Sequence, residues 1–277
     1  MSESSIELET VGLLLDDGVA TVTLNRPDRL NSWTGRMNLE YRTALARAAD
    51  DPEIRVIVVT GAGRGFCSGA DAEALTGHAE RGAYDDGLPE RAPKPGWGVR
   101  PEFDAELAYH LGIDKPIIAM VNGPAAGLGF ALMCWCDLRF AAAGARLTSA
   151  HGRLGLPVEF GLSWLLPRIV GLTRAADILL SSRIFTAEEG YEMGLFNAVV
   201  PPDELGDRVR DYARALATTV APSSLAVTKR QLYRDLLTSD PAGAVRDAEQ
   251  IMTAMMREPE YREGVSALKE KRPPRYR

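Results

Sequence analysis

Two glycine-rich segments, each directly after a short apolar run, constrain the fold of this 277-residue sequence most strongly. The run RVIVVT at 55–60 leads into GAGRGFCSGAD at 61–71, and the run IIAMV at 117–121 leads into NGPAAGLG at 122–129. Short β-branched apolar runs are typical of strands that are buried on both faces. The second glycine turn opens an apolar helical segment that ends near Asp137. This order of elements predicts an α/β protein.

The remaining predicted elements surround these two turns. Further strands are predicted at 10–15, 19–25, 138–143 and 197–200, the first two joined by a hairpin turn at Asp16-Asp17-Gly18. Helices are predicted over 37–48, where apolar residues recur at spacings of three and four, and over 103–112. Residues 76–101 show neither the strand nor the helix period, which predicts a loop or a flap.

From Thr173 onward the pattern is almost wholly helical. Amphipathic helices follow Pro202 and are interrupted near three further prolines, at 222, 241 and 259. We therefore predict a core of strand–strand–helix units over residues 1–200 and a helical C-terminal region over residues 201–277.

The glycine spacing does not match the common phosphate-binding loops. Gly61, Gly63 and Gly65 form G-x-G-x-G, so the dinucleotide pattern fails at Phe66, and no G-K-[ST] follows for a Walker loop. Ser68 stands one position too late for a nucleophile elbow. Two strand-to-helix turns can, however, direct two backbone N–H groups at one point. That is the usual construction of an oxyanion hole.

Composition and charge narrow the class of protein further. The formal net charge is −6 and the isoelectric point is near 5.3, so a nucleic-acid or anionic-membrane partner is not expected. No apolar run approaches the roughly 20 residues that span a bilayer, and the polar N-terminus does not resemble a signal peptide. Three cysteines and three scattered histidines supply neither a disulfide framework nor a metal site. A cytoplasmic protein with reduced thiols is expected.

Together with other segments, the two turns resemble the crotonase superfamily, that is, the enoyl-CoA hydratase/isomerase family. The segments that carry the resemblance are FCSGAD at 66–71, NGPAAGLG at 122–129, CD at 136–137, LNRPDRLNS at 24–32 and GLSWLLPRIVG at 161–171. The resemblance extends from about residue 8 to the C-terminus. It implies a spiral of ββα units followed by a helical region that supports homotrimers, usually paired as hexamers.

The resemblance also implies roles for individual residues. The backbone N–H groups of Ala70 and Leu128 match the two oxyanion donors of the family, and the leucine side chain narrows a site where many members have glycine. The substrate is expected to be an acyl-CoA thioester, with no separate cofactor and no metal. The residues that match the CoA-binding segments are Arg29, Leu30, Ser32, Ser68, Ala70 and Asp71. A solvated surface charge is the alternative interpretation of Arg29.

Two positions depart from the pattern of the hydratases. Where these enzymes hold their two glutamates, the sequence has Ala131 and His151. Hydration needs one group to orient and deprotonate water and another to protonate the α-carbon, and paired carboxylates do both. His151 is therefore predicted either to shuttle a proton, because histidine titrates near neutral pH, or simply to be packed in the interior.

Glu159 is the remaining candidate for acid–base chemistry. It matches the position where dienoyl-CoA isomerases and the 4-chlorobenzoyl-CoA dehalogenase of this superfamily hold an aspartate. The apolar neighbours Val158 and Phe160 should raise the pKa of this carboxyl, which suits a group that takes and returns a proton. The alternative interpretation is a surface carboxylate in a loop or at the start of a helix.

The resemblance thus implies an enzyme of the kind found in fatty acid metabolism, which stabilises the enolate of an acyl-CoA thioester. A single well-placed carboxylate favours C=C isomerisation by proton transfer. Hydration is the alternative reaction, with His151 or a water chain in place of the missing glutamate. Dehalogenation is disfavoured because Glu159 itself would have to attack and no aromatic pocket is evident. A catalytically silent acyl-CoA binder is the alternative from another class, supported by the loss of both glutamates.

Overall fold

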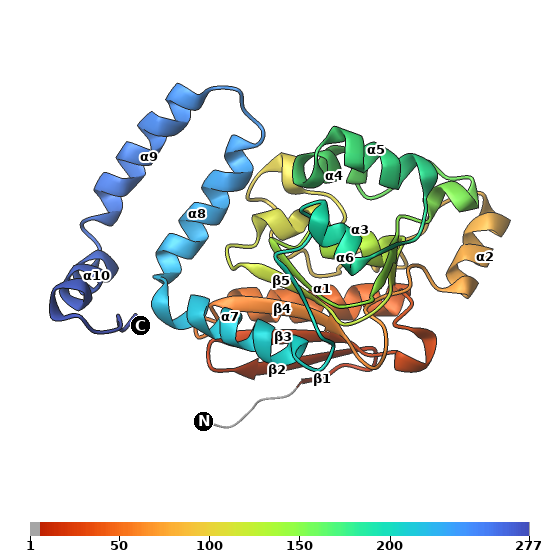
Figure 1. Ribbon diagram of the computed structural model, residues 1–277, viewed down its shortest axis with the longest axis horizontal. Helices are drawn as coiled ribbons and strands as arrows, with labels where there is room; N and C mark the ends of the chain where they lie inside the picture. The colour runs from red at the N-terminus through yellow and green to blue at the C-terminus, as the bar shows by residue number, and fades with distance from the viewer. Residues whose placement is uncertain (1–5, 277) are drawn as a thin grey trace.

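The computed structural model describes residues 6–276 (Figure 1). In it, the two glycine turns follow the carboxyl ends of two adjacent strands of one sheet. The strands that precede the turns, β4 (Val56–Gly61) and β5 (Ile117–Val121), are parallel neighbours. All six residues of β4 are buried, as the apolar run predicted. Because the carboxyl ends of adjacent parallel strands lie at the same end of the sheet, the two turns leave the sheet side by side.

The main sheet has seven strands in the order β1-β2-β3-β4-β5-β7-β10. The other strands of this sheet are β1 (Ile6–Glu7), β2 (Val11–Asp16), β3 (Val19–Leu24), β7 (Leu138–Ala142) and β10 (Ala198–Val200). The pairs from β3 to β10 are parallel, whereas β2 and β3 form the predicted antiparallel hairpin. Asp17 and Gly18 both have positive φ angles at its turn, as a two-residue hairpin turn requires.

A second, smaller sheet lies beside the glycine turns. It contains β6 (Ala125–Ala126), β8 (Arg146–Thr148) and β9 (Phe185–Thr186) in the order β6-β8-β9. The helices of this part of the chain are α2 (Ala72–Arg81), α3 (Leu128–Cys134), α4 (Leu162–Val170), α5 (Leu172–Ser181) and α6 (Ala187–Glu192). The strand β6 lies within the second glycine turn, and α3 is the helix that this turn opens.

The helix α1 (Gly35–Asp50) confirms the spacing found in the sequence. Thr34 caps its N-terminus, since its hydroxyl oxygen accepts a hydrogen bond from the N–H of Met37 at 3.1 Å. The residues whose spacing predicted the helix have no exposed surface: Met37, Tyr41, Leu45 and Ala48. This buried stripe attaches α1 to the sheet.

The main sheet is covered on both faces. Ile57 and Val59 of β4 belong to the large core that includes α1 and α3, whereas Val56 and Val58 pack with Val209 of α7 (Leu205–Thr219). Alternate residues of one strand therefore serve two separate cores. Burial on both faces explains why the strand is a continuous apolar run.

The chain continues with three helices, α8 (Pro222–Asp235), α9 (Pro241–Met255) and α10 (Pro259–Glu270), of which α9 and α10 lie away from the main body in Figure 1. Each begins at one of the prolines that the sequence pattern marked, where a missing N–H group does no harm. No residue of α9 is buried. The helical C-terminal region is thus confirmed, whereas the division of the chain at residue 200 stays a prediction. In the part of the chain that the structure describes, no helix is long and apolar enough to cross a bilayer.

Two local predictions are wrong. Residues 76–81, which were predicted to begin a loop or flap, form the C-terminal part of α2. Asp71 caps the N-terminus of this helix, which ends at Arg81. The helix expected over 103–112 is replaced by two short 3-10 helices, Pro101–Phe103 and Ala108–Gly112. Leu107 between them has a φ of 62°, which a continuous α-helix cannot contain.

Candidate active site

The two glycine turns approach each other at backbone distance. A Cβ atom on Gly129 would stand 2.1 Å from the carbonyl oxygen of Cys67, and one on Gly69 would stand 2.9 Å from that of Ala126. The N–H of Ala126 donates to the carbonyl of Cys67 at 3.0 Å, which joins the two turns directly. Because Gly69 also has a φ of 95°, only glycine suits this position.

This approach leaves two backbone N–H groups without a protein acceptor. Trp33 and Ala70 are partners in an isolated β-bridge, whose hydrogen bonds go to the residues on either side of Ala70. The N–H of Trp33 donates to the carbonyl of Gly69 at 2.7 Å, and the carbonyl of Trp33 accepts from the N–H of Asp71 at 2.9 Å. Among the hydrogen bonds of residues 6–276, none uses the N–H of Ala70 or of Leu128 as the donor. Leu128 is the first residue of α3, where N–H groups have no acceptor within the helix. Both groups can therefore donate to a ligand.

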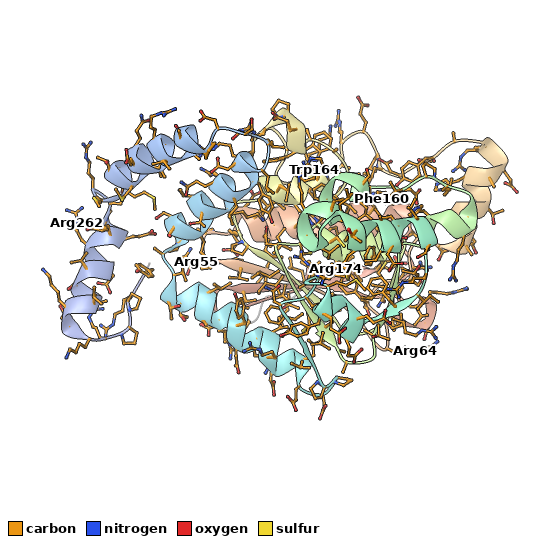
Figure 2. All side chains as sticks on the ribbon, turned by 45° about the horizontal axis from the view of Figure 1, so that its top comes forward. Arg55, Arg64, Phe160, Trp164, Arg174 and Arg262 are labelled. Atoms are coloured by element: carbon orange, nitrogen blue, oxygen red, sulfur yellow. The ribbon has the colours of Figure 1, made fainter. Side chains whose placement is uncertain are left out.

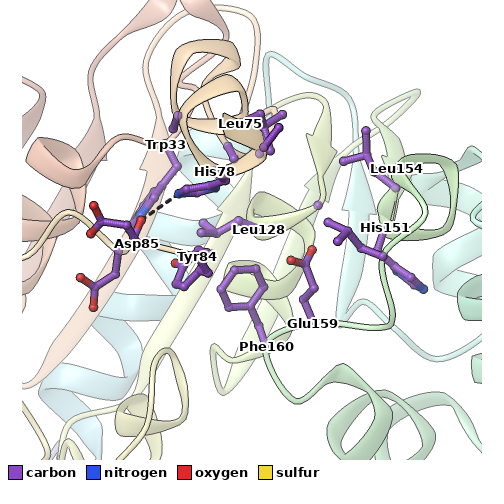
Figure 3. Close-up of a pocket in the computed structure, with 18 of the residues that line it drawn as sticks. Trp33, Leu75, His78, Tyr84, Asp85, Leu128, His151, Leu154, Glu159 and Phe160 are labelled. Atoms are coloured by element: carbon purple, nitrogen blue, oxygen red, sulfur yellow. Dashed lines mark hydrogen bonds between the residues drawn. The ribbon is translucent and has the colours of Figure 1, made fainter. Parts of the chain in front are cut away.

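A cavity of about 580 Å³ brings the predicted catalytic residues together. Ala70, Leu128, His151 and Glu159 all line it, although they come from four separate segments of the chain. Figure 3 shows Leu128 near the centre of the view and the carboxyl group of Glu159 pointing into the space beside it. The arrangement places a possible base in the same cavity as the two free N–H groups.

Glu159 is half-buried and has no hydrogen-bond or salt-bridge partner for its carboxylate among residues 6–276. Burial raises the pKa of this carboxyl above its ordinary value, while His151 and His78 act weakly in the opposite direction. The direction of the shift agrees with the one inferred from its apolar neighbours. A carboxylate without a protein partner is free to exchange a proton with a ligand.

The turn that carries Glu159 is held in one conformation. Phe160 adopts a φ of 51°, and its carbonyl accepts a hydrogen bond from the indole N–H of Trp135 at 2.7 Å. The carbonyl of Glu159 itself accepts from the N–H of Leu162 at 3.1 Å, at the start of α4. Trp135 in turn stacks on Trp164 with ring centroids 6.2 Å apart. The base candidate is therefore attached to a braced segment of backbone.

The two positions where hydratases hold glutamate supply no carboxylate here. Ala131 is fully buried within α3. His151 is 7% exposed and begins a short 3-10 helix, His151–Leu154. In Figure 3 its imidazole is directed away from the carboxyl of Glu159. This orientation favours packing over direct proton transfer.

Two further carboxylates line the cavity and are tied to their own turn. Asp85 accepts from the N–H of Gly87 at 2.9 Å, and Asp86 accepts from the N–H of Leu88 at 2.9 Å. Figure 3 shows Asp85 at the opposite side of the view from Glu159. Among residues 6–276 no group of three or more His, Cys, Asp or Glu side chains could hold a metal ion.

The residues predicted to bind CoA fall into two groups. Ser68 and Ala70 line the cavity, whereas Arg29, Leu30, Ser32 and Asp71 do not. The side chain of Asp71 is held in the protein: it accepts from the Ser32 hydroxyl at 2.7 Å and from Arg26 at 2.9 Å. The Ser32 hydrogen bond and the Arg26 guanidinium keep the pKa of Asp71 low. These contacts give Asp71 and Ser32 a structural task, and CoA binding by the whole set stays a prediction.

Sequence reasoning missed a group of residues that line the cavity from the two positions before α1, from α2 and from the segment after α2. Members of this group are Trp33, Thr34, Leu75, His78, Ala79 and Tyr84. The sequence signal was present, because Asp71 is a good helix cap and Leu75, His78 and Ala79 follow at helical spacing. The Nε2 of His78 lies 2.9 Å from the carbonyl oxygen of Asp85 (Figure 3).

The sequence matches the family model for enoyl-CoA hydratase/isomerase over residues 15–277. It is 35% identical to the 1,2-epoxyphenylacetyl-CoA isomerase of Escherichia coli over 265 residues, which is 95% of this chain and 96% of that protein. The structure is similar to a probable enoyl-CoA hydratase/isomerase from Mycobacterium abscessus, with a TM-score of 0.83, 34% identity and coverage of 96% and 98% of the two chains. Enoyl-CoA hydratase from Bacillus anthracis gives a TM-score of 0.80 at 27% identity, covering 100% of this chain and 99% of that chain.

These similarities and the paired turns define an acyl-CoA enzyme with the crotonase fold. The chain belongs to the enoyl-CoA hydratase/isomerase family, and it is an enzyme of the hydratase/isomerase type. The predicted fold, a spiral of ββα units with a helical C-terminal region, is confirmed.

Proposed function

We propose that this enzyme moves a C=C double bond within an unsaturated acyl-CoA thioester by proton transfer. The observation that carries the proposal is that one unpartnered carboxylate, Glu159, shares a cavity with the free N–H groups of Ala70 and Leu128. A thioester oxygen that accepts from both N–H groups is stabilised as it becomes negative. The role of each of these residues is part of the proposal.

The reaction balances with one base. For a 3-enoyl thioester, the Glu159 carboxylate takes a proton from C2, and the electrons of that C–H bond form a dienolate. The N–H groups of Ala70 and Leu128 hold its negative oxygen. Protonated Glu159 then returns the proton to C4, so the double bond moves from C3–C4 to C2–C3. No water is added, and the oxidation of C2 is balanced by the reduction of C4, so the acyl group keeps its net oxidation level and the step needs no redox cofactor.

Hydration is the second candidate within the family, since many relatives carry that name. It requires one group to deprotonate water and another to protonate carbon. Ala131 offers no such group, His151 is directed away from Glu159, and Asp85 and Asp86 are bound to their own turn. These observations favour isomerisation.

The relative from Escherichia coli is named for an isomerisation of a CoA thioester that carries an epoxide on a six-membered ring. That name supports an isomerase here and suggests that acyl groups with rings fit proteins of this kind. We propose that the substrate is an acyl-CoA and that the residues matching the CoA segments, including Arg29 and Leu30, contact it.

The test uses two substrates in D₂O. The enzyme is incubated with but-3-enoyl-CoA and with crotonyl-CoA, and products are followed by NMR and mass spectrometry. We expect bond migration from the first substrate with deuterium incorporation at carbon. A mass gain of one water molecule from crotonyl-CoA, without migration, would make the enzyme a hydratase. Binding of both thioesters without exchange, migration or hydration would identify a silent binder.

A further inference from the structure

A second cavity of about 540 Å³ adjoins the catalytic cavity. Tyr84 and Phe160 line both of them, and their rings meet edge to face with centroids 6.4 Å apart. Figure 3 shows these two rings side by side, next to the Glu159 carboxyl. Tyr84 and Phe160 therefore form the wall between the catalytic cavity and the second cavity.

Five of the twelve residues that line the second cavity are aromatic. Besides Tyr84 and Phe160, it is lined by Phe103, Trp135 and Trp164. The indoles of Trp135 and Trp164 are stacked with an interplanar angle of 8°, and Figure 2 shows Phe160 and Trp164 as neighbours. The protein thus has an aromatic pocket that was not evident from its sequence. These five residues come from four distant segments, so no local pattern could reveal the pocket.

Each of the two carboxylates in this lining is paired with an arginine, although one oxygen of Glu106 has no hydrogen-bond partner among residues 6–276. Glu106 pairs with the buried guanidinium of Arg42, and Glu102 pairs with Arg100 at 3.3 Å. A cationic occupant would therefore have to compete with an arginine, and an anionic occupant would meet two carboxylates. Removing either charge from water without a partner is unfavourable. The lining suits a neutral group.

The shared wall has one fixed side and one accessible side. Phe160 is held by the hydrogen bond from Trp135 to its carbonyl at 2.7 Å. Tyr84 is 59% exposed and lies beyond the end of α2, in a segment without regular structure. An acyl group that reaches past Glu159 meets this pair first.

We propose that the second cavity holds the distal end of the acyl group, and that this end is a neutral aromatic ring. This inference rests on the proposed function, since it takes the thioester to lie at Ala70 and Leu128. Aromatic pairs favour edge-to-face or offset geometry and contribute beyond their buried area. An aryl-substituted enoyl-CoA should therefore bind more tightly than a linear enoyl-CoA with the same number of carbon atoms.

The test compares binding, so that it does not depend on turnover. Affinities for 4-phenylbut-3-enoyl-CoA, dec-3-enoyl-CoA and but-3-enoyl-CoA are measured by calorimetry in the Glu159→Gln protein. The first two ligands have the same number of acyl carbons. We expect the phenyl compound to bind about two- to tenfold more tightly than the decenoyl compound, the range that aromatic pairs provide.

A cavity-filling variant locates the ring. Ala105 lines the second cavity from an exposed position, so Ala105→Trp adds bulk there without disturbing the core. We expect the preference for the phenyl over the butenoyl compound to fall roughly tenfold or more. Ala143→Trp, at an exposed turn outside both cavities, is the matched control and should keep the preference.

Two results would overturn the proposal: an unchanged preference after Ala105→Trp is added to the Glu159→Gln protein, or phenyl binding no tighter than decenoyl binding in the Glu159→Gln protein itself. Failure of the proposed function looks different. If the phenyl compound binds as expected but the enzyme with Glu159 intact does not isomerise it in D₂O, the cavity assignment is supported and the isomerase assignment fails.

Discussion

At the scale of single residues, the proposed chemistry depends most directly on Glu159. The Glu159→Gln change keeps the size and hydrogen-bonding capacity of the side chain but removes its basicity. We expect turnover of but-3-enoyl-CoA to fall about 10²–10⁴-fold, the usual contribution of acid–base catalysis. Affinity for the thioester should be nearly unchanged, which steady-state kinetics and calorimetry can establish together.

His151→Ala is the control for this change. If the imidazole only packs, the variant should lose much less activity than Glu159→Gln. An inactive His151→Ala protein beside an active Glu159→Gln protein would identify His151 as the working base and contradict the assignment.

The pH dependence of the same residue has a definite sign. Proton abstraction needs the ionised carboxylate, so kcat/KM should rise with pH through the pKa of Glu159. Because burial raises that pKa, the acidic limb should be centred above the ordinary value of 4.5. A raised pKa also means that the folded state favours the protonated form, so folding loses stability as pH rises from the ordinary to the raised pKa. Glu159→Gln removes this cost, and its melting temperature near neutral pH should not fall.

The proposed oxyanion donor at Ala70 can be tested by a change that acts on the backbone. Ala70→Pro removes the N–H group but adds little bulk. Loss of one such donor costs about 2.7–4 kcal/mol of transition-state stabilisation, which should appear as a lower kcat. The variant should still fold, because the two hydrogen bonds between this turn and Trp33 use Gly69 and Asp71 and not the N–H of Ala70. Circular dichroism checks that it does. A folded variant that turns over at the parent rate would exclude Ala70 as a donor.

At the scale of elements, the turn between the 3-10 helix His151–Leu154 and α4 carries the proposed base, and the indole N–H of Trp135 donates a hydrogen bond to that turn. In Trp135→Phe the ring packing is largely kept and the N–H donor is lost. We expect the free energy of unfolding to fall by about 0.5–1.5 kcal/mol. We also expect kcat for but-3-enoyl-CoA to fall about tenfold with little change in KM, because the carboxylate is less well placed. Steady-state kinetics and urea unfolding measure the two effects.

Trp164→Phe separates the hydrogen bond from the stacking. It alters the same indole pair but leaves the bond from Trp135 to Phe160 intact. An equal loss of kcat in both variants would show that packing alone positions the turn.

What could be predicted from the sequence follows the range of the interactions. The apolar run of β4 and the spacing along α1 are local patterns, and the structure confirms both. The contact of Gly69 with Ala126, and the bond from Trp135 to Phe160, join residues far apart in the chain. Neither produces a local pattern, so the free N–H groups and the second cavity could not be derived without the fold. The resemblance to a family, rather than periodicity, pointed to Ala70, Leu128 and Glu159.

At the scale of the whole molecule, the helices of the C-terminal region differ in how they bury apolar surface. The helix α7 packs Leu205, Val209 and Ala213 against the main sheet. The three helices after it leave many large apolar side chains exposed: Leu232, Leu236, Val245, Met252, Met256, Tyr261 and Leu268. Figure 1 shows α9 and α10 away from the main body, to which α8 is joined by the ion pair of Lys229 with Asp137. An apolar surface of this kind is typical of an interface between proteins.

We therefore predict that the chain forms a trimer or a hexamer through α8–α10, as the family resemblance also implies. Size-exclusion chromatography with light scattering should give three or six times the 30.1 kDa mass of the chain. A stable monomer at micromolar concentration would contradict this prediction. Met252→Glu places a charge among the exposed apolar side chains of α9 and should shift the assembly toward smaller species, since a charge buried at an interface needs a partner. Gln250→Glu puts the same charge two residues away, on the opposite side of the helix, and should leave the mass unchanged. If both variants keep the parent mass, α9 does not form the interface, and the apolar side chains of α8 and α10 are the ones to substitute next.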